Sequence, residues 1–342
     1  MARAACGLDR SSSPGLTDGS YTDDVLQAVK GQARAMTVML LDAFEWYAYS
    51  YVEPEVAQVI CGGSDTAAWL LMAVPWMTQP LGGLLVGHFA DRCGRRNAMV
   101  CSGVLNLVAA LGQALTPARP VIGPLWLGVC RALLGLEYGG SETACHVYLA
   151  ESVPRRALAV TQLLIDVPHA FGYLAISAVM VPFHGLLPRS EMLRWGWRVP
   201  FVVGAALATV SLFFRSELEE TAEFEAAKLD DDSSSEPDTD LAGVGEYWKK
   251  GLMVILGTAM MHSVDGLMLD FLKSWLISHC GVSPYTSAVL LAQSQVVALA
   301  SNVVAMVVAD TYGLATGGLM LCSLGLGSIP LWGALYWLQG GA

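Results

Sequence analysis

Charged residues are scarce in this 342-residue chain, where they make up 14% of the sequence against 54% hydrophobic residues. A soluble chain carries about a quarter charged residues. A membrane β-barrel is built from short segments of about 10 residues in which polar and apolar residues alternate, and such segments are also missing. The apolar stretches are instead unbroken and approach or exceed the roughly 20 residues that cross a bilayer as a helix. These absences exclude an ordinary soluble domain and indicate an all-α polytopic membrane protein.

Sequence patterns that serve catalysis or metal binding are missing as well. The eight cysteines show neither CxxC nor zinc-type spacing, and no phosphate-binding glycine loop or nucleophile–base pair stands out. We therefore expect no enzymatic activity, no cofactor and no bound metal. The net charge of −11 argues against nucleic acid as a partner. The N-terminal tail lacks the apolar core of a signal peptide, so it is interpreted as cytosolic.

Hydropathy divides the chain into membrane spans and solvated segments. Nine apolar windows predict transmembrane helices, at about 35–60, 67–90, 97–116, 121–150, 157–183, 197–214, 251–278, 284–309 and 315–338. An acidic, Ser-rich stretch that contains Pro237 separates the sixth window from the seventh. The predicted organisation is a cytosolic tail (1–34), a six-helix bundle (35–214), a cytosolic central loop (215–250) and a second, partial three-helix bundle (251–342).

The basic residues set the expected orientation. With the N-terminus in the cytosol, most of the 19 Lys and Arg residues fall on the cytosolic side, among them Arg34, Arg96, Arg156 and Arg215. Cytosolic loops of membrane proteins are enriched in these residues. We therefore expect a multi-pass protein with a cytosolic N-terminus in the plasma membrane, with an organelle membrane as the alternative.

Ionisable residues inside the predicted spans are the clearest functional signal. Charges within a bilayer are costly, so they face a cavity or one another and mark ion or substrate paths. The candidates for a proton or substrate path are Asp42, Glu45, Arg131, Glu137, Glu142, Asp166, His169, Asp265 and Asp270. Asp42 and Glu45 lie three residues apart and share one helix face. Arg131 either pairs with an anionic substrate or neutralises Glu137 or Glu142.

A charged turn between the second and third spans is the candidate conformational motif. It reads GHFADRCGRR and contributes Gly87, Asp91, Arg92, Gly94, Arg95 and Arg96. Gly94 permits a tight turn, and Asp91 can pair with Arg92 or Arg95. A second turn, VVADTYG at 307–313, places Asp310 at the equivalent point of the second half. The simpler interpretation of the first turn is a basic anchor for membrane topology.

Glycine and aromatic residues have both a packing and a functional interpretation. Small residues allow close helix approach, and packing is the interpretation we favour for Gly82, Gly83, Gly135, Gly139 and Gly140. The aromatic run on the first span could form a cation–π site or simply pack; it comprises Trp46, Tyr47, Tyr49 and Tyr51. Glu53 and Glu55 flank Pro54 near the end of that span and are expected to be solvated.

Several motifs, in order, resemble the major facilitator superfamily. GHFADRCGRR is similar to the loop that this superfamily carries between its second and third helices. Further segments narrow the resemblance to the metabolite:proton symporter family, which includes proline/betaine and 2-oxoglutarate carriers. These segments are DAFEWYAY (42–49), PLGG (80–83), GLEYGGSE (135–142), YLAESVPRR (148–156), LRWGWRVPF (193–201) and RSELEETAEF (215–224). The resemblance implies two six-helix bundles, proton-coupled transport and functional acids at Glu45 and Asp166.

The sequence departs from that family at several positions. Ala48 stands where the family has an acid, Gln79 replaces its arginine before PLGG, and Ser141 replaces the acid after the paired glycines. Gln79 thereby joins the candidate substrate path. Family members have twelve helices, so we expect this sequence to be a C-terminally truncated piece of a longer protein. A degenerate paralogue, or a partner that supplies the remaining helices, is the alternative.

The sequence as a whole predicts a secondary transporter. A small carboxylate or zwitterion would cross the lipid bilayer together with protons by alternating access between the two halves. The alternative is a facilitator-like receptor or interaction protein that does not transport, or an inactive truncated paralogue. Loss of the acid at Ala48 and of three helices motivates that alternative.

Overall fold

The computed structural model describes residues 26, 29–152 and 158–220, with scattered residues between 277 and 304. The described helices are α2 (Ala33–Val59), α3 (Asp65–Cys93), α4 (Arg95–Ala114), α5 (Ile122–Ser152), α6 (Leu158–Leu186), α7 (Arg189–Arg194), the 3-10 helix η2 (Gly196–Arg198) and α8 (Val199–Ser216). The first six predicted spans are thus confirmed as helices. Spans seven to nine, with Asp265, Asp270 and Asp310, lie outside the described residues.

The long helices differ in how charged they are. By length and composition, the stretches able to cross a membrane are Asp65–Cys93, Arg95–Ala114, Leu164–Leu186 and Gly196–Ser216 within the described residues. The remaining long helices, α2 and α5, carry Arg131 and, within the described residues, all but one of the acids proposed for the proton or substrate path. These two helices therefore bring most of the candidate charged groups into the bundle.

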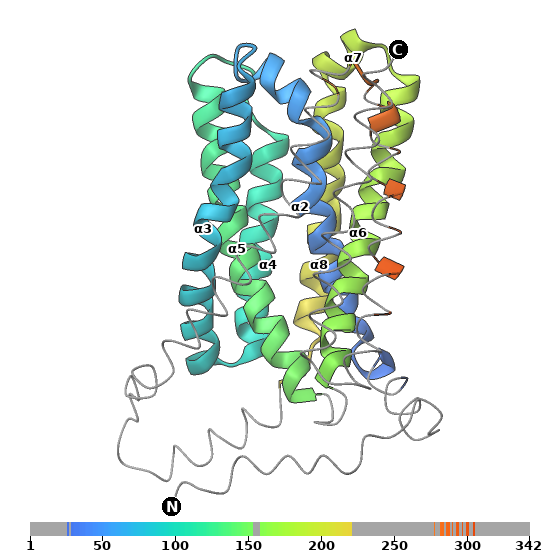
Figure 1. The fold of residues 1–342 in the computed structure, drawn as a ribbon. Coiled ribbons are helices and arrows are strands. Elements are labelled where there is room, and N and C mark those ends of the chain that lie inside the picture. Colours follow the sequence, from blue (N-terminus) through green and yellow to red (C-terminus); the bar gives the residue numbers. More distant parts are fainter. Residues whose placement is uncertain are drawn as a thin grey trace, which may run out of the picture.

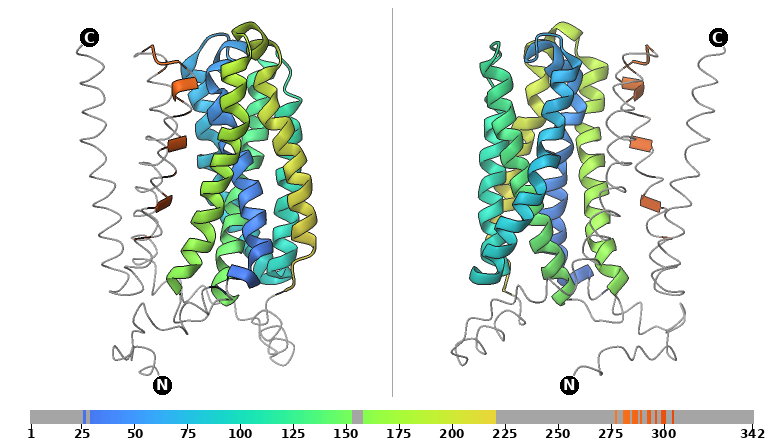
Figure 2. Two further views of the ribbon diagram at one scale, coloured as in Figure 1. Left: turned by 90° about the vertical axis from the view of Figure 1, so that its right-hand side faces the viewer. Right: turned by 60° about the vertical axis from the view of Figure 1, so that its left-hand side comes forward.

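The long helices run side by side along one common direction (Figures 1 and 2). α3 packs along α5, α4 packs against both α5 and α8, and α2 packs against α6 and α8. α2 therefore contacts helices on both sides of the bundle, which explains why most of its side chains are buried, including Asp42 and Glu45.

Glycines bring α3 and α5 into close contact. A Cβ atom at Gly82 would lie 2.0 Å from the Leu136 carbonyl oxygen, and one at Gly139 would lie 2.0 Å from the Gln79 carbonyl oxygen. A side chain at either position would collide with the backbone of the opposite helix. The packing interpretation of these glycines is confirmed.

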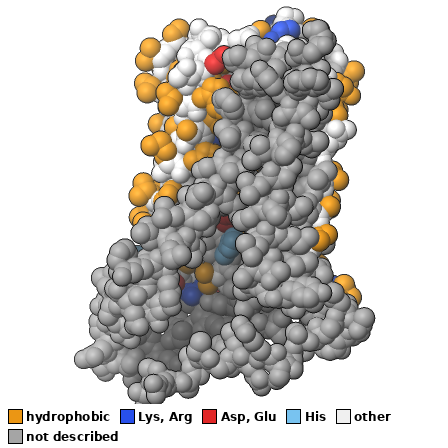
Figure 3. All heavy atoms as spheres, in the orientation of Figure 1, with side chains coloured by type: hydrophobic (Ala, Val, Ile, Leu, Met, Phe, Trp, Pro, Cys, Tyr) orange, Lys and Arg blue, Asp and Glu red, His pale blue; other side chains and the backbone are white. Residues whose placement is uncertain are grey.

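Apolar side chains cover the outer face of the bundle. Figure 3 shows hydrophobic side chains along the outer edge on the side of α3. Exposed members on α3, α4 and α5 are Leu70, Met77, Leu84, Leu85, Val108, Leu125 and Val129. An exposed apolar surface of this extent is typical of a protein that contacts lipid.

Candidate functional site

A buried ion cluster joins four helices through Arg215. The guanidinium, which is 0% exposed, forms ion pairs with Asp42 of α2 and Glu137 of α5, the latter at 3.0 Å. Its Nη1 atom donates to the Met99 carbonyl oxygen and the Ser102 hydroxyl of α4, each at 2.6 Å. Arg215 itself belongs to α8. One side chain thus connects α2, α4, α5 and α8.

Further hydrogen bonds hold Asp42 in this cluster. Its Oδ1 atom accepts from Asn106 Nδ2 at 3.1 Å and from Ser211 Oγ at 3.0 Å. The Ser141 hydroxyl donates to Asp42 Oδ2 at 3.4 Å. A buried charge is tolerated when it is paired and hydrogen-bonded in this way. We call Asp42, Glu137 and Arg215 the Arg215 cluster.

The structure adds to two sequence predictions about these charges. Arg215, which we expect on the cytosolic side of the membrane, is fully buried at the end of α8, because Gly103 of α4 leaves room for its aliphatic stem. Of the alternatives for Arg131, neutralisation of Glu137 is wrong, because Arg215 fills that role. Arg131 and Glu137 are six positions apart, so their side chains leave α5 in different directions.

Glu45 lies one helical turn beyond Asp42 in a second polar group. Its carboxylate is 1% exposed, and Oε1 accepts a hydrogen bond from Gln113 Nε2 at 2.8 Å. Its Oε2 atom is buried against Gly204 and has no hydrogen-bond partner among the described residues. Glu45 is thus a buried acid with one carboxylate oxygen that could accept a proton.

Arg131 provides the positive charge near Glu45. It attracts the Glu45 carboxylate, and its guanidinium carbon lies 4.4 Å from the centre of the Tyr49 ring. Its Nε atom donates to the Leu71 carbonyl oxygen at 3.4 Å. The cation–π contact on this part of α2 is therefore made by the protein's own arginine. We call Glu45, Gln113, Arg131 and Tyr49 the Glu45 group.

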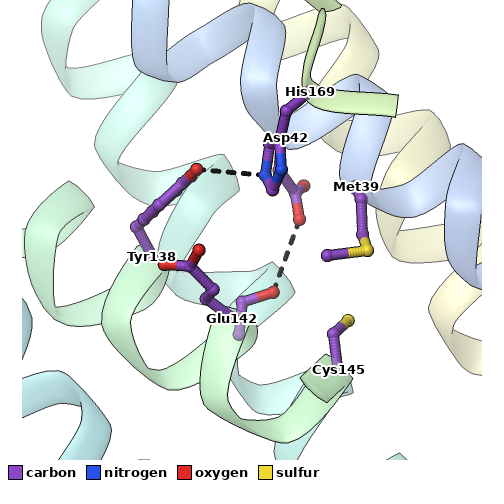
Figure 4. A pocket seen from close by; sticks show the side chains of 7 residues that line it. Met39, Asp42, Tyr138, Glu142, Cys145 and His169 are labelled. Carbon is purple, nitrogen blue, oxygen red and sulfur yellow. Dashed lines mark hydrogen bonds between the residues drawn. The ribbon is translucent and has the colours of Figure 1, made fainter. Parts of the chain in front are cut away.

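A small recess opens between α2, α5 and α6. Its lining residues are Met39, Asp42, Tyr138, Ser141, Glu142, Cys145 and His169, and it has room for about one water molecule. Figure 4 shows these side chains converging from the three helices. The Tyr138 hydroxyl and His169 Nε2 are hydrogen-bonded at 3.0 Å, which joins α5 to α6.

Glu142 is held in the recess by a neutral neighbour. Gln79 Nε2 on α3 donates to Glu142 Oε2 at 3.1 Å. The other oxygen of Glu142 lies 3.8 Å from His146 Nε2, one turn along α5. The amide of Gln79 fixes the orientation of Glu142 and leaves its charge in place. Asp166 is half-buried on α6, one turn before His169, and does not line the recess.

Aromatic rings pack against Tyr138, which lines the recess. The Trp46 ring stacks on Tyr138 with their centres 4.1 Å apart, and Trp76 packs edge-on against Trp46 at 5.1 Å. Tyr47 packs edge-on against Tyr173 of α6 at 4.8 Å. These rings contact one another, which supports the packing interpretation of the aromatic run.

The charged turn at 87–96 is linked to the end of α8. Gly94 adopts φ +98° between α3 and α4, as the tight turn requires. Arg95 Nη1 lies 3.6 Å from Asp91 Oδ1, and the Glu220 carboxylate accepts from the backbone N–H groups of Arg95 and Arg96 at 2.9 and 3.2 Å. Gly87 and Arg92 take no part in these contacts. Glu220 therefore caps the N-terminus of α4.

At the opposite end of α2, the sequence prediction of solvated acids is wrong. Glu53 and Glu55 are 3% and 1% exposed. Glu55 forms an ion pair with Arg189 of α7. The short helix α7 folds back over this end of α2 and excludes solvent from the carboxylate.

Comparison with known proteins agrees with this architecture. The model of the Major Facilitator Superfamily matches residues 35–340. The Proline/betaine transporter of Escherichia coli K12 is 29% identical over 204 residues, which are 56% of this chain and 41% of the transporter. The Alpha-ketoglutarate permease of the same organism is 25% identical over 305 residues, 86% of this chain and 69% of the permease. The chain thus spans about half the length, or less, of the first curated relatives it matches.

Solved structures share the same fold. The xylose transporter of E. coli, in a partially occluded inward-open conformation, superposes with a TM-score of 0.60 at 17% identity, covering 82% of this chain and 73% of the transporter. A D-xylose-proton symporter gives a TM-score of 0.62 at 19% identity, covering 83% and 69%. The chain belongs to the Major Facilitator Superfamily and, like its transporter relatives, is a multi-pass integral membrane protein.

Proposed function

We propose that this protein is a proton-coupled secondary transporter for a small carboxylate or zwitterionic metabolite and that it works by alternating access. The single observation that carries the proposal is Glu45. This buried acid has one carboxylate oxygen without a hydrogen-bond partner among the described residues, and it lies near the charge of Arg131. Enclosed ionisable groups in membrane proteins mark proton and ion paths. The relatives, a proline/betaine transporter and an alpha-ketoglutarate permease, carry substrates of the proposed classes.

The proposed coupling assigns different roles to Glu45 and the recess. Protonation of Glu45 removes its attraction for Arg131 and so alters the contact between α2 and α5. The contacts of Arg131 with Tyr49 and Leu71 do not depend on the Glu45 charge. The recess lies one to two turns away along α2 and faces α6. Proton binding at one place would thereby change the helix packing at the other.

The proposed arrangement places the N-terminus and the 215–250 loop in the cytosol, with 35–214 as the first bundle and 251–342 as part of the second. Basic residues near the 87–96 turn favour this orientation. Movement of one bundle against the other would expose the recess to each side in turn.

One observation favours a second candidate function, a facilitator-like receptor or inactive paralogue that does not transport. The recess has room for about one water molecule, less than a whole metabolite needs. Such a receptor would bind ligand at the membrane surface without moving it across.

The test uses the full 342-residue chain in proteoliposomes with an imposed inward proton gradient. Uptake of labelled proline, betaine and 2-oxoglutarate is measured with and without a protonophore. We expect accumulation of at least one compound, its collapse with the protonophore, and loss of accumulation in Glu45→Gln with exchange of internal for external substrate retained. Glu191→Gln, the same chemical change on exposed α7, is the matched control and should behave as wild type.

Accumulation that neither the protonophore nor Glu45→Gln affects would contradict the proposal. Ligand binding without any uptake would favour the receptor. Exchange is the useful second readout, because it requires substrate binding and conformational change but no net proton movement.

A further inference from the structure

We propose that the recess between α2, α5 and α6 binds the protonated primary or secondary amine of the substrate and excludes both carboxylate and quaternary ammonium groups. This inference rests on the proposed transport function, because it names the substrate group that the site selects. Three properties of the recess carry it, namely the charge of its lining, the way in which Glu142 is held, and its size.

The charge of the lining favours a cation. Asp42 and Glu142 contribute carboxylates, whereas no Lys or Arg side chain lines the recess within the described part of the chain. Arg215 pairs with Asp42 and offsets its charge, so the other carboxylate that a ligand meets is Glu142, which has His146 Nε2 3.8 Å from its Oε1 atom. A substrate carboxylate placed here would face two acids and would be repelled.

The hydrogen-bonding groups suit an N–H donor. Gln79 donates to Glu142 Oε2 and orients the carboxylate, while His146 Nε2 lies 3.8 Å from the other oxygen. The Tyr138 hydroxyl, hydrogen-bonded to His169, lies one turn before Glu142 on the same helix, and Asp42 lines the recess from α2 (Figure 4). An ammonium group with two or three N–H bonds can donate to acceptors on more than one wall at once. A quaternary ammonium has no N–H to donate.

The size of the recess also discriminates among amines. It holds about one water molecule, and a protonated amine is of similar size. Met39 and Cys145 also line the recess (Figure 4), and their side chains would collide with added N-methyl groups. Tyr138 already stacks on Trp46 at 4.1 Å, so one face of each ring is covered and the pair does not form an open aromatic cage for a methylated cation.

The test is a binding series on the purified full-length chain, measured by isothermal titration calorimetry. The probes are proline, N-methylproline, N,N-dimethylproline and tetrahydrofuran-2-carboxylate, in which oxygen replaces the amine. A second series uses alanine and its N-methylated forms. We expect affinity to fall with each methyl group, and the quaternary and amine-free compounds to bind about 10- to 100-fold more weakly than the parent, as expected for loss of a charged hydrogen bond.

Two variants locate the effect in the recess. Glu142→Gln should weaken binding of the parent amino acids about 10- to 100-fold and abolish the preference for an amine over the tetrahydrofuran. Met39→Ala enlarges the recess and should reduce the loss of affinity caused by each N-methyl group. Misfolding would not produce such a gain. Met192→Ala, a buried methionine at the far end of the bundle, is the matched control and should leave the order unchanged.

Equal affinities within both series, or an unchanged order in Glu142→Gln, would overturn the inference. So would proton-driven uptake of 2-oxoglutarate in preference to all the amines, although that result would leave the transporter proposal standing. Failure of the transport proposal alone would also be recognisable. If the amines bind in the expected order but no compound is taken up, transport is contradicted while the assignment of the recess holds.

Discussion

The Arg215 cluster and the recess share Asp42, yet they treat charge in different ways. In the cluster, a guanidinium that is 0% exposed contacts groups on α2, α4 and α5 from its position on α8. In the recess, the charge of Glu142 is oriented by a neutral amide, and the cavity beside it is empty enough for a small group. We therefore propose that charge in this bundle serves two purposes, an architectural one at the Arg215 cluster and a binding one at Glu142.

The largest expected effect comes from breaking the cluster. Arg215→Leu leaves Asp42 and Glu137 buried without their cation, and removal of one partner from a buried ion pair costs about 3–5 kcal/mol. We expect a strongly lowered thermal unfolding temperature in detergent. The triple variant with Asp42→Asn and Glu137→Gln should recover part of that loss. A single variant as stable as wild type would contradict the architectural role.

An intermediate effect is expected where α3 meets α5. Gly139→Val places atoms against the Gln79 carbonyl oxygen, where a Cβ would lie 2.0 Å away. Overpacking of this kind costs about 1–3 kcal/mol. Because Gln79 also holds Glu142, the variant should weaken amine binding as well as lower the unfolding temperature. Gly87→Val is the control, because a Cβ at Gly87 would have no atom within 4 Å. It should change neither amine binding nor the unfolding temperature.

A smaller effect is expected at the end of α4. Glu220→Gln weakens the carboxylate cap on the Arg95 and Arg96 N–H groups, and loss of a helix cap costs about 1 kcal/mol. Thermal unfolding should shift slightly, with amine binding unchanged. A large loss of stability would show that the turn at 87–96 belongs to the same framework as Arg215.

The smallest effect on stability is expected in the recess itself. Glu142 lies beside a cavity and its side chain is 23% exposed, so Glu142→Gln should leave the unfolding temperature close to that of wild type. Its effect should appear in ligand binding. If Glu142→Gln destabilised the protein as much as Arg215→Leu, the contrast between the two regions would be lost.

Hydropathy predicted the helices because the physics of the bilayer acts on each segment separately. A window of about 20 apolar residues must form a helix in hydrocarbon, whatever its neighbours are. The spacing of Asp42 and Glu45 likewise placed both on one buried face, which the structure bears out. The packing role of glycines such as Gly82 and Gly139 also followed from local composition, although the sequence did not show that α3 and α5 meet through them.

The sequence patterns did not predict which side chains pair between helices. Arg215 stands at the end of its span, where basic residues usually reach toward the cytosol. Its burial depends on α8 packing against α2 and α4, with Gly103 making room. The sequence does hold a weak signal, because Gly204, Ala208, Ser211 and Arg215 share one face of α8 at helical spacing. The contact between Tyr138 and His169 likewise depends on how α5 and α6 meet.

The most direct test of the central claim is proton movement itself. Unlabelled proline or 2-oxoglutarate is added to proteoliposomes that hold the full chain in a lightly buffered medium, and external pH is followed with a dye. We expect alkalinisation outside as protons enter with substrate, and none in Glu45→Gln. Substrate entry without proton movement, or the same alkalinisation in Glu45→Gln, would contradict it.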